Sequence, residues 1–194
     1  MKILLCTQNK YKAEEFAHLL PGLEIDLMDQ NIIMPPESAD TYEGNARIKA
    51  DFGRSIDTNT WVLADDSGLE ITALGNNPGV KSARFAGENS TIEQNKALVF
   101  EKLKTHTQES ERRAKFICVL ILVSPTGEEF ITRGESHGYI SLEPSHRSGF
   151  GYDPMFIPDG HNKTYTSLDH HIKMQISHRA RACKNLLEIL SYGA

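Results

Sequence analysis

The hydrophobic and polar positions of the chain alternate between the period of a strand and the period of a helix. Residues 2–5 form a short apolar run that predicts a buried strand. Apolar residues then recur at the spacing of one helix face, at Ala13, Phe16, Ala17 and Leu20. Leu23, Ile25 and Leu27 alternate with acidic residues, which is typical of a half-buried strand. The chain is therefore predicted to open as strand, helix and strand.

The middle of the chain repeats this alternation. Asp40 and Thr41 are good N-cap residues, so a helix is expected to begin near them. The next strand is predicted over residues 61–64, where it ends at two aspartates. The segment LGNNPGV, residues 74–80, predicts a loop because glycine and proline favour turns.

The remaining pattern predicts one more helix, a hairpin and a closing helix. The helix covers about residues 91–104, and the longest apolar strand, 116–123, pairs with 130–133 in the hairpin. The closing helix presents an apolar face made of Cys183, Leu186, Leu187 and Leu190. Alternating strands and helices without an internal repeat or a long linker predict an α/β fold with a mixed sheet, as one domain over residues 1–194.

Composition narrows the classes of function. The 194 residues are 39% hydrophobic and 24% charged, an ordinary globular mixture, with a formal net charge of -5. This charge provides no basic field for a nucleic-acid polymer, so an anionic ligand must be small and held by local groups or by a metal. No apolar run approaches the ~20 residues of a membrane span, and the apolar start ends at Cys6, so we expect a cytoplasmic protein. The three cysteines have no paired spacing and are expected to be reduced packing residues.

Three polar clusters follow predicted strands or turns, where open α/β sheets place their ligands. In TQNKYK, residues 7–12, the amides of a helix start and the Lys12 ammonium could hold a phosphate, although the glycine pattern of a P-loop is missing. In ADDSG, Asp65 and Asp66 with Glu37 would suit Mg²⁺, which binds through one or two carboxylates plus substrate phosphates. The alternatives are an ordinary capped helix start and an ordinary turn.

The third cluster, GFGYD at residues 149–153, has two glycines that let backbone approach a planar ligand and aromatic rings that could stack on a base. The alternative is an aromatic-filled hairpin corner. In ISHRA, Ser177 predicts an N-cap, and His178 and Arg179 would present donors near a helix start, or His178 is structural. Asn45 and Lys49 share one face of their helix, and Lys49 is either solvated or directed at phosphate.

Taken in order, TQNKYK, ESADTYEGNARIKA, LADDSGLEI with PGVKSARFAG, GFGYDPMF and ISHRA resemble the non-canonical purine nucleoside triphosphate pyrophosphatases, the inosine/xanthosine triphosphatase family. The resemblance runs from about Lys2 to Leu190. It implies an elongated central mixed sheet flanked by helices, with the active site in a cleft between two lobes. Two departures are visible: Gly44 stands where many relatives have glutamate, and Ser38-Ala39 replaces a more usual threonine-glycine.

The resemblance also implies roles for individual residues. Asp66 is implied as the general base, with Lys49 as a second catalytic residue, and Glu37 and Asp66 are implied as metal ligands. The residues implied to bind substrate are Thr7, Gln8, Asn9, Lys10, Tyr11, Lys12, Ser67, Phe150, Gly151, Tyr152, Asp153, Lys173, His178 and Arg179. Among these, residues 150–153 are expected to line the base pocket.

The implied reaction is hydrolysis of ITP, dITP or XTP between the α and β phosphates, which gives the nucleoside monophosphate and pyrophosphate. One or more Mg²⁺ per subunit and a homodimer are expected, with no nucleic-acid polymer or membrane as partner. Hypoxanthine and xanthine carry a carbonyl at position 6 where adenine carries an amino group, so a pocket of donors would reject ATP. His178, Arg179 and nearby backbone amides are expected to be those donors. Two alternatives stay open: a related hydrolase of modified pyrimidine or canonical triphosphates, and a nucleotide sensor without turnover.

Overall fold

The computed structural model describes residues 1–145, 147 and 149–192, and the chain divides into two compact units. Unit 1 comprises Met1–Asp66, Cys118–Gly134 and His178–Ala194, and unit 2 comprises Ser67–Ile117 and Glu135–Ser177. Each unit thus draws on separate stretches of the chain. The prediction of a single domain is not tested by this division and stays a prediction.

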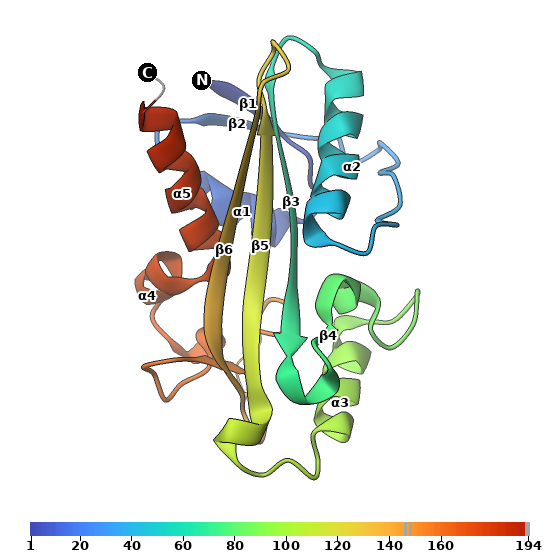
Figure 1. Ribbon diagram of the computed structural model, residues 1–194, viewed down its shortest axis with the longest axis vertical. Helices are drawn as coiled ribbons and strands as arrows, with labels where there is room; N and C mark the ends of the chain where they lie inside the picture. Colours follow the sequence, from blue (N-terminus) through green and yellow to red (C-terminus); the bar gives the residue numbers. More distant parts are fainter. Residues whose placement is uncertain (146, 148, 193–194) are drawn as a thin grey trace. The chain divides into compact units, whose positions relative to one another are not determined.

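Strands and helices alternate along the first part of the chain (Figure 1). Unit 1 contains β1 (Lys2–Leu5), α1 (Lys10–Leu19), β2 (Glu24–Leu27), α2 (Tyr42–Ile56) and α5 (His178–Tyr192). Unit 2 contains β4 (Asn77–Pro78), α3 (Ile92–Lys102), β7 (Phe156–Pro158), α4 (His170–Ile176) and four short 3-10 helices, η1 (Thr72–Leu74), η2 (Gly79–Arg84), η3 (Glu109–Arg112) and η4 (Tyr165–Ser167). Three strands contribute residues to both units: β3 (Trp61–Ile71), β5 (Arg113–Val123) and β6 (Glu129–Ile140).

The strands form one seven-stranded mixed sheet in the order β2-β1-β3-β5-β6-β7, with β4 paired to β3. β1 runs parallel to both β2 and β3, whereas the β3–β4 and β6–β7 pairs are antiparallel. The predicted α/β class with a mixed sheet is therefore confirmed. In the part of the chain that the structure describes, no helix has the length and apolar character needed to span a membrane.

In unit 1, α1 and α5 cover one face of the sheet and α2 covers the other (Figure 1). Ala13, Phe16 and Leu186 pack with Leu63 on the first face, and Ala46 and Ala50 pack with Val62 and Ala64 on the second. Alternate residues of β3 thus face opposite layers, as a pleated strand requires. The Cys6, Cys118 and Cys183 thiols are free and buried, which confirms their prediction as packing residues.

Local capping explains where the helices of unit 1 begin. Asn9 caps α1 by accepting hydrogen bonds from the backbone N–H groups of Tyr11 and Lys12. Thr41 caps α2 by accepting from the Gly44 N–H at 3.0 Å, as the sequence predicted. The start of α5 lies so close to β6 that a side chain at Gly134 would collide with the His178 carbonyl.

Unit 2 is built around an aromatic core and one buried cation. Phe116 and Phe156 pack edge to face with ring centroids 4.7 Å apart, beside Tyr165. The Arg112 guanidinium is buried and donates to the backbone carbonyls of Leu103, His106, Ile140 and Ser141 at 2.5–3.0 Å. These bonds hold together segments that lie far apart in the sequence.

Several sequence-based boundaries were wrong. β3 does not end at Ala64 but continues through both aspartates to Ile71, and β6 extends to Ile140. Ala17 is exposed on α1 rather than part of its buried face. The short elements β4, β7 and α4 were not predicted from the sequence. In the extended parts of β3 and β6, pairing with neighbouring strands overrides the local turn preference of Asp, Ser and Gly.

Candidate active site

Asp65 and Asp66 lie within β3, beside the carboxyl end of β1. The β1–β3 pairing ends at Leu5 and Leu63, so both aspartates lie just beyond the last paired residues. They are nearly fully buried, with exposed fractions of 1% and 4%. Because consecutive strand residues point to opposite faces, Asp65 faces the layer of α1 and α5, and Asp66 faces α2.

On the α2 face, two carboxylates converge on one ammonium. The Lys49 Nζ atom lies 2.5 Å from Glu37 Oε1 and 3.7 Å from Asp66 Oδ1. Lys49 is buried on α2, and Glu37 is half-buried in the segment between β2 and α2. The predicted catalytic pair and the predicted metal ligands therefore form one cluster in unit 1.

Asn45 connects this cluster to the segment that carries Glu37. It is completely buried, its Nδ2 donates to Asp66 Oδ2 at 3.2 Å, and its Oδ1 accepts from the Ala39 backbone N–H at 2.9 Å. One side chain thus holds both Asp66 and the chain two residues after Glu37. Asn45 was not predicted as a site residue, although Asn45 and Lys49 are four residues apart and were predicted to share one helix face.

The surroundings shift the proton affinities of this cluster. Burial raises the pKa of Asp66 to about 6; Lys49 and Lys12 oppose the shift, while Glu37 and Asp65 add to it. Burial opposes the charge of Lys49, but the carboxylates of Asp65, Glu37 and Asp66 outweigh it and raise the Lys49 pKa above its ordinary value. Lys49 is therefore a permanent cation, and Asp66 is an unusually basic carboxylate.

The cluster fits a divalent cation that takes two ligands from the protein and the others from water and substrate. Among residues 1–145, 147 and 149–192, no three histidine, cysteine, aspartate or glutamate side chains gather closely enough to hold a metal. Glu37 and Asp66 already share one cation, the Lys49 ammonium, so their oxygens converge on positive charge. Mg²⁺ commonly uses one or two carboxylates with waters and substrate phosphates, and this donor set matches that habit.

On the α1 and α5 face, Asp65 forms a different cluster. The Lys12 Nζ atom lies 2.7 Å from Asp65 Oδ2. Burial disfavours the Asp65 carboxylate, but Lys12, Lys49 and Arg179 outweigh it and hold its pKa well below the ordinary value. Asp65 is thus a permanently ionised anion surrounded by cations.

Arg179 belongs to this second cluster. It is buried at the start of α5, its Nη1 donates to Glu15 on α1, and its guanidinium lies 5.5 Å from the centroid of the Phe16 ring. Burial opposes the guanidinium charge, but Glu15 and other negative groups, Asp65 among them, raise the Arg179 pKa. These contacts indicate a role within unit 1, whereas the sequence-based role of Arg179 at the purine stays a prediction.

In the TQNKYK segment, hydrogen bonds hold the first residues, whereas Lys10 and Tyr11 are exposed. The Thr7 Oγ1 accepts from the Asn9 N–H at 3.2 Å, and the Gln8 Nε2 donates to the carbonyls of Ile32 at 2.6 Å and Gln30 at 3.3 Å. Gln8 therefore holds the segment that leads to Glu37. Lys10 is exposed, and the Tyr11 side chain is 62% exposed.

The predicted base-pocket residues lie in unit 2. The Tyr152 hydroxyl donates to the Ser82 carbonyl at 2.8 Å, and its ring is buried in the core. Asp153 pairs with the Lys173 ammonium at 2.7 Å, and Gly151 has a φ of +55°, a left-handed conformation that favours glycine. Phe150 is half-buried. The Tyr152 ring is thus held in place by the core of unit 2.

Ser67, predicted to bind substrate, follows Asp66 directly in β3 and is half-buried. His178, the first residue of α5, is buried in unit 1. Ser177 precedes it with extended backbone, as an N-cap position requires.

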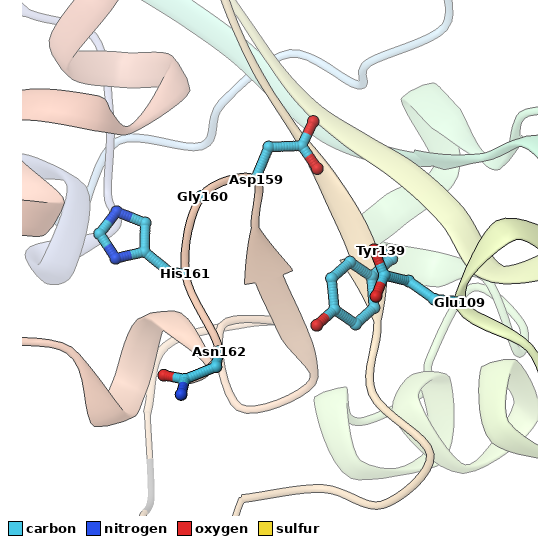
Figure 2. A pocket seen from close by; sticks show the side chains of 6 residues that line it. All are labelled: Glu109, Tyr139, Asp159, Gly160, His161 and Asn162. Atoms are coloured by element: carbon cyan, nitrogen blue, oxygen red, sulfur yellow. The ribbon is translucent and has the colours of Figure 1, made fainter.

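A polar depression of about 440 Å³ also occurs in unit 2, lined by Glu109, Tyr139, Asp159, Gly160, His161 and Asn162 (Figure 2). None of these lining residues was predicted to act on substrate. The Asp159 carboxylate is paired with the Arg113 guanidinium at 2.7 and 2.8 Å. We therefore do not propose this depression as the catalytic site.

The two departures from the family pattern lie in contact. A Cβ atom added to Gly44 would stand 2.6 Å from the Ala39 Cβ and 3.0 Å from the Thr41 Oγ1. The methyl group of Ala39 therefore leaves no room for a larger residue at position 44. The Ala39 N–H donates to Asn45 Oδ1 at 2.9 Å.

Comparison with known proteins agrees with this arrangement over nearly the whole chain. The dITP/XTP pyrophosphatase of Bdellovibrio bacteriovorus is 39% identical over 195 residues, 98% of each chain, and that of Deinococcus radiodurans is 41% identical over 187 residues, covering 96% of this chain and 91% of the relative. The structure of the Staphylococcus aureus Ham1 protein matches with a TM-score of 0.86 and 34% identity over 100% of both chains. The Ham1 family model matches residues 3–189, and the chain belongs to the Ham1 family.

Proposed function

We propose that this chain is a nucleoside triphosphate pyrophosphatase that hydrolyses ITP, dITP and XTP to the nucleoside monophosphate and pyrophosphate. The observation that carries this proposal is the buried Glu37–Lys49–Asp66 cluster, in a chain about 40% identical to relatives named dITP/XTP pyrophosphatase. Such an activity would remove non-canonical purines from the nucleotide pool before they enter DNA or RNA.

Asp66 acts as the general base in this proposal. A carboxyl group with a pKa of about 6 is mostly ionised at neutral pH, yet it accepts a proton more readily than an ordinary aspartate. Asn45 fixes the orientation of this carboxylate through its amide. Asp66 would therefore take a proton from the water that attacks the phosphoanhydride.

The lysines balance the charge of the triphosphate. Lys49 stays protonated beside Asp66 and Glu37, and Lys12 presents a second ammonium near the start of α1. The backbone N–H groups at that helix start add partial positive charge. Together these groups would orient the phosphates, and Lys49 would stabilise negative charge that develops during hydrolysis.

Magnesium is proposed as the cofactor, with one or more ions per subunit. Glu37 and Asp66 would hold it through their carboxylate oxygens. When bound, it would polarise the phosphate oxygens and neutralise part of their charge.

Phe150, Gly151, Tyr152, Asp153 and Lys173 are proposed to bind the substrate. His178 and Arg179 are proposed as donors to the purine. Donors placed at position 6 of the purine favour hypoxanthine and xanthine over adenine, because adenine would leave a donor facing a donor. We further propose a cytoplasmic homodimer.

A panel of triphosphates tests this function. The protein is incubated with magnesium and dITP, XTP, ITP, dUTP, ATP or GTP, and pyrophosphate and orthophosphate are measured separately. We expect pyrophosphate and the monophosphate from the first three substrates, with little turnover of the others. Orthophosphate as the first product, a preference for the pyrimidine, or binding without turnover would each reject the proposal.

A further inference from the structure

The first aspartate of the ADDSG motif, Asp65, has no role in the mechanism above. We propose that Asp65 is a positioning residue that holds the Lys12 ammonium in place to receive the triphosphate, a role that rests on the proposed function. Asp65 would act through Lys12 and not through Asp66 or the metal.

The geometry favours a positioning role over metal binding. Asp65 faces α1 and α5, whereas Glu37 and Asp66 gather at Lys49 beside α2. The Oδ2 atom of Asp65 already accepts from the Lys12 ammonium at 2.7 Å.

Lys12, in contrast, remains accessible. Its side chain is 16% exposed while that of Asp65 is 1% exposed. A lysine ammonium has three N–H donors, and one bond to Asp65 leaves the others for an anion. Lys12 also lies in the first turn of α1, where the dipole of the helix favours an anion.

Fixing the lysine has a clear physical benefit. A free lysine side chain loses much rotamer freedom when it binds a ligand, and this loss weakens binding. Lys12 is already held in one position by Asp65, so less freedom remains to be lost. The buried Arg179, itself paired with Glu15, adds positive charge that stabilises the Asp65 anion.

A double-mutant cycle tests the proposal with a ligand that does not depend on turnover of a purine. The dissociation constant of inorganic tripolyphosphate is measured by calorimetry, with magnesium present, for wild type, Asp65→Asn, Lys12→Met and the double variant. We expect Asp65→Asn to weaken binding roughly 10-fold and Lys12→Met at least as much. In the Lys12→Met background, Asp65→Asn should change binding by less than about twofold.

Other outcomes have different meanings. Equal weakening by Asp65→Asn in both backgrounds would show that Asp65 acts through another group, and an unchanged constant would show that it is only structural; either result overturns the proposal. If wild type itself does not bind tripolyphosphate, the proposed function fails first. Asp26→Asn is the matched control, because the Lys2–Asp26 pair of the same unit is half exposed and should not affect binding.

Steady-state kinetics with dITP provide a second readout. Asp65→Asn should raise KM about 10-fold and leave kcat within about threefold, because the groups that act on water lie on the other face. A loss confined to kcat would contradict the positioning role.

A measurement on the wild-type chain covers the case in which Asp65→Asn does not fold. The side-chain ammonium signal of Lys12, assigned by its loss in Lys12→Met, should be resolved in the ligand-free protein by nitrogen-15 NMR. It should shift when tripolyphosphate is added. An unresolved signal, or one that does not respond to tripolyphosphate, would contradict the proposal.

Discussion

β3 carries one aspartate on each of its two faces in unit 1, and the two aspartates differ in pKa. Asp65 and Asp66 are neighbours in one strand and are almost equally buried. The pKa of Asp65 lies below the ordinary value, whereas that of Asp66 is raised to about 6. Burial acts on both in the same direction, so the difference comes from the charges that each carboxylate faces.

Those charges are set by the helices on the two faces. Asp65 meets Lys12 from α1 and Arg179 from α5, and Lys49 adds to their effect. Asp66 meets Lys49 from α2, but it also meets the negative charges of Glu37 and Asp65. Two adjacent carboxylates thus differ in proton affinity, because environment rather than residue type sets the pKa of a carboxyl group.

Removal of divalent cations should have the largest effect on turnover, because the proposed metal ligands lie on the face of β3 that carries Asp66. We expect turnover of ITP to fall to background in excess chelator and to return when Mg²⁺ is added, because Glu37 and Asp66 converge where the metal would be held. The measurement is pyrophosphate release. Substantial turnover in excess chelator would remove the metal from the mechanism.

Replacing Arg179 should damage the Asp65 face. Arg179→Met leaves Glu15 without its buried partner, so we expect a loss of about 3–5 kcal/mol in the free energy of unfolding. Glu15→Gln in the same chain should restore part of the loss. Urea unfolding measures both changes.

The same Arg179→Met variant separates the two roles of this residue. If Arg179 acts within unit 1, the ratio of kcat/KM for ITP to that for ATP should change little. If it donates to the purine carbonyl, as the sequence predicts, the ratio should fall by roughly 10- to 150-fold. We expect this fall, because Arg179 is proposed as a donor to the purine. An unchanged ratio in a folded variant would contradict the donor role and leave Arg179 with its contact to Glu15.

The pH dependence of stability should have opposite signs on the two faces. A raised carboxyl pKa stabilises the fold fully below the unfolded value, and this contribution is lost as pH rises through the folded value. In the metal-free protein, wild type should therefore lose up to about 3 kcal/mol relative to Asp66→Asn between pH 4 and 7. The lowered pKa of Asp65 predicts the reverse, stability that is present above pH 4 and lost as pH falls below it.

Urea unfolding in chelator, from pH 3 to pH 7.5, measures both effects. A difference between wild type and Asp66→Asn that does not vary with pH would show that the Asp66 pKa is not raised.

Removing the Asn45 amide should have the smallest effect on stability. Asn45→Ala leaves the Ala39 N–H without its acceptor and should cost about 1–3 kcal/mol. Asn95 is a matched control in unit 2: it is also fully buried and bonds to Ala86, Ser90 and Ala83. Both alanine variants should lower stability similarly, but only Asn45→Ala should reduce turnover per folded molecule. Equal turnover in the two variants would contradict the role of Asn45 at Asp66.

Much of the fold could be predicted from the sequence because its signals are local. The apolar runs of β1 and β5 and the capping residues Asn9 and Thr41 specify their own elements. The extension of β3 through ADDSG could not be predicted, since the local turn preference points the other way and only pairing with neighbouring strands overrides it.

The residues of the candidate site were predicted from motifs, but the contacts between these residues were not. The convergence of Glu37, Lys49 and Asp66 brings together three separate segments, which the motif order suggested but spacing alone does not fix. The partners of Asp65 and Arg179 come from contacts between β3, α1 and α5, far apart in the chain. Pairings of this kind depend on tertiary packing and leave no local signal.

The most direct test of the two-face account compares Asp65→Asn with Asp66→Asn in single-turnover hydrolysis of saturating dITP with magnesium. Asp66→Asn keeps the shape of the side chain but removes the base, so its rate should fall by roughly 10²–10⁴-fold while tripolyphosphate still binds. Asp65→Asn should hydrolyse bound substrate at a rate within about threefold of wild type and show weaker binding instead. If the two variants lost the same step to the same extent, or if folded Asp66→Asn kept the wild-type rate, the account would be contradicted.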